Sequence, residues 1–129
     1  MSRGSAYAGF GFELPIRTKT ENNNDEHWRK RWRRAKYQRD TVHQYLVFLR
    51  QQRFKVWLPL TVTMIRVAPR QLDDIDNLSS AMKHIRDGIA DFLEIDDRTP
   101  LVQWHYAQTR GRPKYYGIRI ILQSREEHI

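Results

Sequence analysis

The chain has 129 residues and carries 23 Lys and Arg against 15 Asp and Glu, so its formal net charge is +8. Its hydrophobic fraction of 40% argues against a disordered chain, and its length suits one domain with one core. Cysteine is absent, which excludes disulfides and zinc–thiolate sites, and no apolar run is long enough to cross a bilayer. We therefore expect a cytoplasmic protein with a single domain over residues 1–129, in which 1–8 and 124–129 are loose tails.

Hydrophobic periodicity predicts a strand over residues 10–18 and then a long helix over about 26–51. The apolar positions of this helix recur at steps of three, four or seven and form one stripe: Trp28, Trp32, Ala35, Val42, Leu46 and Leu49. We expect this stripe, with both of its tryptophans, to face the core.

Residues 54–68 alternate in character and predict a second strand, which Pro59 places at a sheet edge where it begins. A second helix is expected over about 77–93. Its core-facing residues are Leu78, Met82, Ile85, Ile89 and Leu93. Two strands over 101–107 and 115–122 follow, joined by a hairpin-like loop. The order β-α-β-α-β-β predicts a small α/β domain with a mixed sheet and two helices on one of its faces.

An acidic segment interrupts this basic chain at residues 71–97, QLDDIDNLSSAMKHIRDGIADFLEIDD. Eight of the 15 carboxylates lie between 73 and 97 beside only two cations, so this segment carries −6 and the rest of the chain +14. Asp74 and Asp76 follow the second strand, and residues i and i+2 of an extended chain point the same way. Together with Asp97 they would suit Mg²⁺, which takes oxygen ligands and substrate phosphates.

Asp97 is difficult to bring to this pair, because a straight helix over 77–93 would hold it roughly 25 Å from the helix start. It reaches Asp74 and Asp76 only if the helix ends early and the chain doubles back, or if it comes from a partner subunit. The alternative interpretation is structural: the first acids cap the helix, and Asp97 shapes a turn.

Lys83 lies seven residues after Asp76 and also has two interpretations. Its ammonium could bind the scissile phosphate near the carboxylates, or form an i,i+4 ion pair with Asp87. The five histidines lack the spacing of a zinc site, and GFGF lacks the lysine of a phosphate-binding loop. We therefore expect no zinc and no small-molecule cofactor.

The motif DIDNL, a helix with a lysine, the closing DGIADFLEIDD and the two strands after it resemble the RusA-type Holliday-junction resolvases. These are small, dimeric, Mg²⁺-dependent endonucleases of bacteria, often carried by prophages. The resemblance covers most of the chain and implies that Asp74, Asp76 and Asp97 are the essential acids at a site for Mg²⁺, or Mn²⁺ in its place. The family lysine would fall on Ser80, so Lys83, one helical turn later, is its candidate replacement.

Three basic segments are candidates for contact with DNA phosphates. The first, RKRWRRAKYQR, has seven cations and no acid, and its expected solvent-facing DNA contacts are Arg29, Lys30, Arg33, Arg34 and Lys36. The other candidates are Arg110, Arg112 and Lys114 in the last loop, and Arg70 before the acidic motif. The alternative interpretation of the first segment is an ordinary solvated helix face.

The resemblance implies a Mg²⁺-dependent, structure-selective endonuclease that resolves four-way junctions by paired symmetric nicks in DNA recombination and repair. A homodimer would supply the two active sites that this reaction needs. Branched DNA is then the expected partner, and no membrane contact is expected. Two alternatives stay open: a non-catalytic nucleic-acid-binding protein, whose acids only cap and turn, and a nuclease that acts on other branched DNA.

Overall fold

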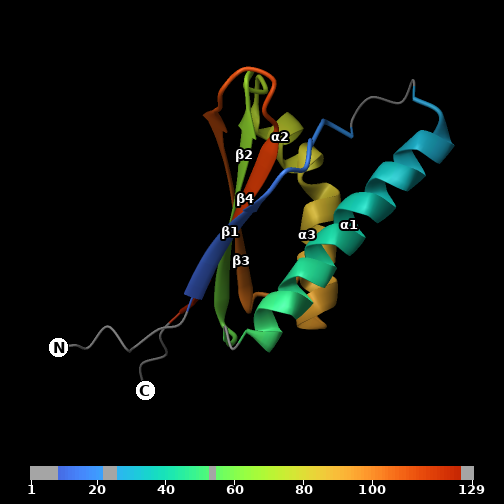
Figure 1. Ribbon diagram of the computed structural model, residues 1–129. Coiled ribbons are helices and arrows are strands. Elements are labelled where there is room, and N and C mark those ends of the chain that lie inside the picture. Colours follow the sequence, from blue (N-terminus) through green and yellow to red (C-terminus); the bar gives the residue numbers. More distant parts are fainter. Residues whose placement is uncertain (1–8, 22–25, 53–54, 126–129) are drawn as a thin grey trace.

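The structure is a computed structural model that describes residues 9–21, 26–52 and 55–125, except for the side chain of Ile75. Its elements are β1 (Gly9–Leu14), α1 (Trp28–Gln51), β2 (Leu60–Ala68), α2 (Ile75–Ala81), α3 (Lys83–Leu93), β3 (Val102–Arg110) and β4 (Gly117–Ser124). Figure 1 shows a small α/β fold with one mixed four-stranded sheet, which confirms the predicted class. Within the described ranges, no helix combines the length and the apolar character needed to cross a membrane.

The sheet has the order β1-β4-β2-β3. β2 pairs in parallel with β3 and antiparallel with β4, so it lies inside the sheet and separates the last two strands of the chain. The predicted hairpin is therefore wrong, because the helices between β2 and β3 form a crossover that makes these two strands neighbours. The edge position inferred from Pro59 is wrong as well: Pro59 precedes the first strand residue, Leu60, and removes no donor from the strand itself.

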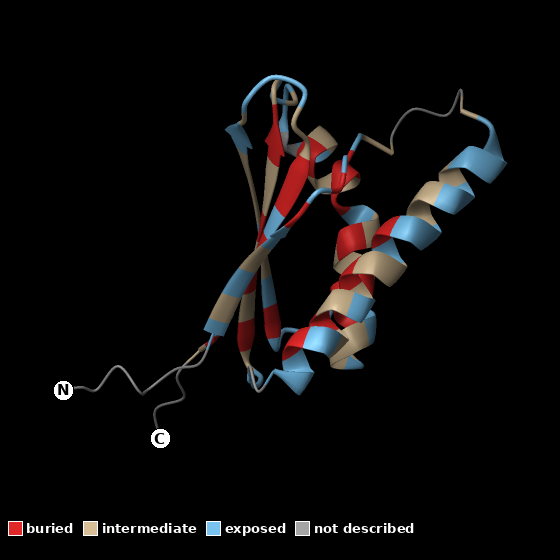
Figure 2. Cartoon of the chain, in the orientation of Figure 1, coloured by how far each residue is buried: buried red, intermediate tan, exposed pale blue. Residues whose placement is uncertain are grey.

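The core lies between the sheet and the helices α1 and α3, which run side by side in Figure 1. On β2, the alternate residues Leu60, Val62 and Met64 are fully buried. The helices contribute the predicted residues Val42, Leu46, Leu49, Leu78, Met82, Ile85 and Ile89, whereas Leu93 is only partly buried. Figure 2 shows buried stretches on the strands and on the helices.

The first turns of α1 depart from the prediction. Trp28 and Trp32 are 60% and 58% exposed, and the first fully buried residue of the helix is Gln38. Figure 1 shows the reason: the beginning of α1 extends past the other elements, so no described part of the sheet lies beneath it. The expectation that both tryptophans face the core is therefore wrong.

The second predicted helix is divided into α2 and α3 at Met82, whose φ and ψ are −96° and 3°. α3 ends at Leu93, and Glu94 then adopts the left-handed conformation, with φ 57° and ψ 46°. The expected tail at 124–129 begins later than predicted, because Ser124 is buried in β4 and the Arg125 N–H donates to the Pro59 carbonyl at 2.8 Å. Residues 126–129 and the expected tail at 1–8 lie outside the described residues.

Candidate functional site

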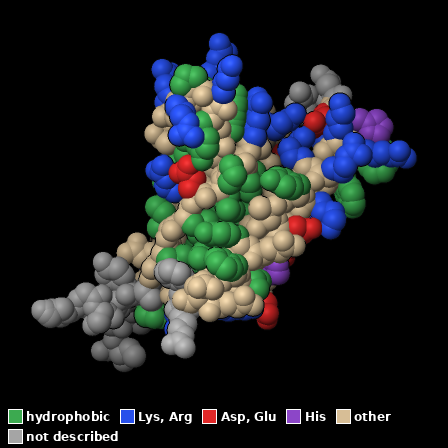
Figure 3. Space-filling model, viewed as in Figure 1, with side chains coloured by type: hydrophobic (Ala, Val, Ile, Leu, Met, Phe, Trp, Pro, Cys, Tyr) green, Lys and Arg blue, Asp and Glu red, His purple; other side chains and the backbone are tan. Residues whose placement is uncertain are grey.

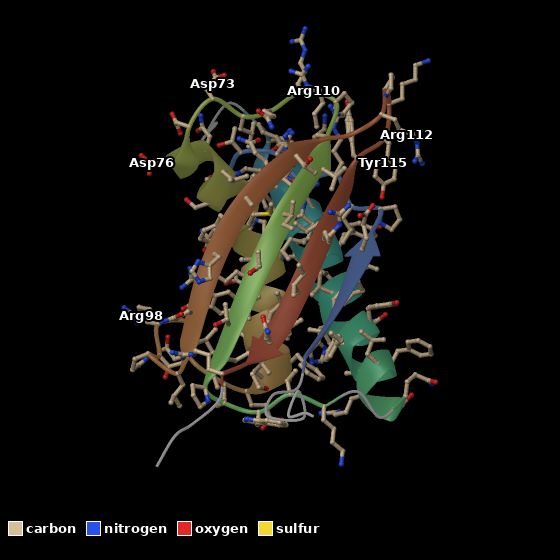
Figure 4. The ribbon with its side chains drawn as sticks, turned by 90° about the vertical axis from the view of Figure 1, so that its left-hand side faces the viewer. Asp73, Asp76, Arg98, Arg110, Arg112 and Tyr115 are labelled. Atoms are coloured by element: carbon tan, nitrogen blue, oxygen red, sulfur yellow. The ribbon has the colours of Figure 1, made fainter. Side chains whose placement is uncertain are left out.

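Asp74 and Asp76 lie at the beginning of α2, after the end of β2. Asp74 is the N-cap residue, and its Oδ1 accepts a hydrogen bond from the Asn77 N–H at 2.8 Å. Asp76 is in the first turn of the helix, and both aspartates are exposed. Figure 4 places Asp76 at the same end of the sheet as Arg110. Capping is thus one role of Asp74, whereas the Asp76 side chain has no hydrogen bond or ion pair within the described residues.

Asp97 lies alongside α3, because the turn at Glu94 sends the chain back along the helix. Its Oδ2 is 3.2 Å from Arg86 Nε, and its carbonyl accepts hydrogen bonds from Arg86 Nη2 at 2.8 Å and Trp104 Nε1 at 3.0 Å. Arg86 precedes the end of α3 by seven residues, which is about two helical turns. The chain therefore doubles back after α3, which is one of the two routes by which Asp97 was expected to approach Asp74 and Asp76.

The three predicted metal ligands nevertheless do not meet within one chain. Among the described residues, no group of three or more Asp, Glu, His or Cys side chains is placed to hold a metal ion. Figure 4 shows Arg98, which follows Asp97, well down the sheet from Asp76. In this arrangement Arg86 neutralises Asp97. A three-carboxylate cradle for Mg²⁺ thus does not fit the residues of a single chain as they are arranged here.

A cleft of about 480 Å³ lies beside α2 and α3. Its lining residues are Glu21, Ser79, Ser80, Lys83, Arg86, Asp87, Asp97 and Tyr106. Ser80 and Lys83, the two positions considered for a functional lysine, therefore share one cleft with Asp97. The alternative ion pair between Lys83 and Asp87 is absent: Lys83 is exposed, and the nearest charge partner of Asp87 is His84 Nδ1 at 3.9 Å.

Burial dominates the titration of the groups at the edge of this cleft. It raises the pKa of Asp87, an effect that His84 opposes and the neighboring carboxylate of Asp97 reinforces. Burial also lowers the pKa of His84, although Glu21 and Asp87 act in the other direction. Proton uptake is therefore favoured at the Asp87 carboxylate and disfavoured at the His84 imidazole.

Glu21 is a residue of the cleft that sequence reasoning missed. Its backbone N–H donates to Ser80 Oγ at 2.9 Å, and its carboxylate accepts two hydrogen bonds from Arg34, at 2.9 and 2.7 Å. A second carboxylate, Glu26, also accepts two hydrogen bonds from Arg34, which hold the pKa of Glu26 at about 2. Because these partners are 13 to 59 residues away from Glu21, no local pattern could have indicated them.

The Arg34 side chain is only 15% exposed, so the expectation that it faces solvent is wrong. All other predicted DNA contacts are exposed: Arg29, Lys30, Arg33, Lys36, Arg70, Arg110, Arg112 and Lys114. Lys36 forms an ion pair with Asp40 at 2.9 Å, and the guanidinium carbon of Arg112 lies 4.4 Å from the center of the Tyr115 ring. Figure 3 shows Lys and Arg side chains gathered at the upper end of the molecule, around the tip of the sheet and the beginning of α1.

Comparisons with known proteins found no match from which a function could be inferred. No family model matches the chain, and no curated protein matches it either. A function can therefore be inferred only from the placement of charge on the fold and from the resemblance of the acidic motif to the RusA-type resolvases.

Proposed function

We propose that the protein binds branched DNA, four-way junctions above all, and cleaves its backbone as a Mg²⁺-dependent homodimeric endonuclease. One observation carries the proposal: the exposed acids at the start of α2 lie at the same end of the sheet as an exposed basic loop (Figure 4). Cations hold phosphates, whereas bare carboxylates repel them. Exposed carboxylates within a phosphate-binding surface therefore suggest that a divalent cation accompanies the DNA.

Asp74 and Asp76 are the residues proposed to bind Mg²⁺. One or two carboxylates, together with the substrate phosphates, can suffice to bind this ion. Bound there, Mg²⁺ would supply charge neutralisation at the phosphate. Asp97 would join these residues only after it has left Arg86, or from the partner of a homodimer. Since the three carboxylates do not converge in one chain, we assign no catalytic step to the metal. Lys83, exposed at the cleft, is proposed to contact a phosphate near the cut.

The test is to incubate the protein with a labelled four-way junction, with and without Mg²⁺. We expect paired symmetric nicks only with Mg²⁺, and expect Asp76→Asn to abolish them while junction binding is kept. Asp91→Asn is the matched control, because Asp91 is exposed on α3 and does not line the cleft. Junction binding without any metal-dependent cut would contradict the endonuclease. Equal cleavage of flaps and forks would instead favour a nuclease with a broader range of branched DNA.

A non-catalytic nucleic-acid-binding protein is the second candidate function. It is favoured by two contacts described above: Asp74 caps α2, and Asp97 is paired with Arg86. Asp97→Asn separates the two candidates. It should abolish cleavage if Asp97 belongs to the catalytic acids. It should lower only the free energy of unfolding if Asp97 serves the ion pair alone.

A further inference from the structure

The first turns of α1 carry an exposed aromatic pair within a basic surface. Trp28 and Trp32 expose more than half of their surface, and a shallow hollow of about 340 Å³ is lined by these two side chains with Arg29 and Arg33. The guanidinium carbon of Arg29 lies 5.2 Å from the center of the Trp28 ring. Contiguous exposed apolar surface often marks a binding site, and here the cations beside the two rings select for negative charge.

The spacing of the two tryptophans suits a planar ligand. Positions i and i+4 lie on one face of a helix and are separated by a rise of about 6 Å. Together the two exposed side chains offer an unpaired base an aromatic surface on which it can stack.

We propose that Trp28 and Trp32 bind an unpaired nucleobase by stacking, with Arg29 and Arg33 on the flanking phosphates. The inference rests on the DNA-binding part of the proposed function and does not need cleavage. Every base has a π-face, so this contact is tolerant of sequence but requires a base that is not stacked inside a duplex. It would thus favour single strands and the opened positions at a branch point over intact duplex.

Two other occupants fit the surface less well. A second copy of this chain that docked symmetrically here would bring Arg29 and Arg33 against their own equivalents, and like charges repel. A lipid surface needs a broad apolar face, whereas the two tryptophans lie among Arg29, Lys30 and Arg33, all of which are exposed.

The experiment measures binding in EDTA, so that cleavage plays no part. Fluorescence anisotropy would follow a labelled thymidine 20-mer and a duplex of the same length, with the wild-type chain and three variants. Trp28→Ala/Trp32→Ala removes both rings, and Trp28→Phe/Trp32→Phe keeps aromatic faces. Trp57→Ala is the control, because Trp57 is 45% exposed and lies outside α1.

We expect the double alanine variant to bind the single strand about ten- to a hundredfold more weakly and the duplex less than about threefold more weakly. The double phenylalanine variant should keep most of the affinity, and Trp57→Ala all of it. Equal losses on both DNAs, or no loss, would overturn the stacking contact. The proposal would also be overturned if the alanine variant showed no selective loss of affinity for the single strand but no longer formed a dimer in sedimentation. Loss of binding to phosphatidylserine vesicles, again without a selective loss of affinity for the single strand, would overturn it too. Since the assay contains no Mg²⁺, its outcome is separate from that of the cleavage test.

Discussion

The two halves of α1 follow the same apolar stripe but are held in the fold by different forces. In the C-terminal half, Val42 and Leu46 are fully buried and Leu49 nearly so, in contact with the rest of the core. In the N-terminal half, the tryptophans of the stripe are exposed, and the attachment to the rest of the chain is polar. It includes the hydrogen bonds from Arg34 to Glu21 and Glu26.

This difference shows that periodicity identifies a face of a helix but not what covers it. A stripe is buried only where another element lies opposite, and Figure 2 shows this along the length of α1. The apolar half should respond to loss of volume, and the polar half to loss of charge and to pH. Substitutions in each half test that division.

Leu46→Ala should cause the largest loss of stability. Leu46 is fully buried, so its truncation removes apolar contacts and leaves a cavity, and the free energy of unfolding should fall by about 2–5 kcal/mol. Urea denaturation followed by circular dichroism would measure this change. Trp32→Ala on the same stripe is the control and should cost less than about 1 kcal/mol. Equal losses from the two substitutions would show that the two halves do not differ.

Arg34→Met should have the second largest effect. The side chains of Arg34 and Glu21 are only 15% and 10% exposed, and loss of their charged hydrogen bonds should cost about 1–3 kcal/mol. Arg33→Met is the matched control, because Arg33 is exposed and its replacement should change stability by less than about 0.5 kcal/mol. Denaturation at low and at high NaCl should give nearly the same loss, because salt screens a largely buried pair much less than an exposed one. Equal changes from Arg34→Met and Arg33→Met would contradict a stabilising role of these hydrogen bonds.

The sequence predicts what depends on near neighbours and misses what depends on distant ones. Alternation predicted the strand that became β2, and helical spacing predicted Met82 and Ile85 as core residues, because each pattern is local. The strand order was missed because β4 inserts beside β2 only in the folded chain.

In the candidate site, too, the sequence predicted local features and missed contacts between distant residues. Asp74 was expected as either ligand or cap, and its capping bond belongs to local geometry. The helix end at Leu93 was predicted, but the pairing of Asp97 with Arg86 also depends on the left-handed turn at Glu94, which has no glycine to signal it. Glu21 reaches the cleft only through tertiary contacts, so no spacing rule includes it.

The pH dependence of stability should be steeper with His84 than without it. Burial lowers the pKa of His84 in the folded chain, so the unfolded chain binds a proton first as the pH falls. The stabilisation from neutral His84 is therefore complete above its ordinary pKa of about 6.5 and is lost below it. His84→Gln should reduce the fall in unfolding free energy between about pH 7.5 and 5.5. An unchanged slope would show that burial does not lower the pKa of His84 in the folded chain.

The smallest effect on stability is expected for Lys36→Ala, near the boundary between the two halves. Its ion pair with Asp40 is exposed on both sides, and such pairs contribute little, so the urea midpoint should hardly change. The same substitution should act on DNA binding if Lys36 contacts a phosphate. Affinity for duplex should then fall, and the slope of log K against log salt should become shallower by about 0.9. Loss of stability without a change in this slope would assign Lys36 to the fold, whereas a changed slope with unchanged stability would extend the nucleic-acid surface from the tryptophans to the middle of α1.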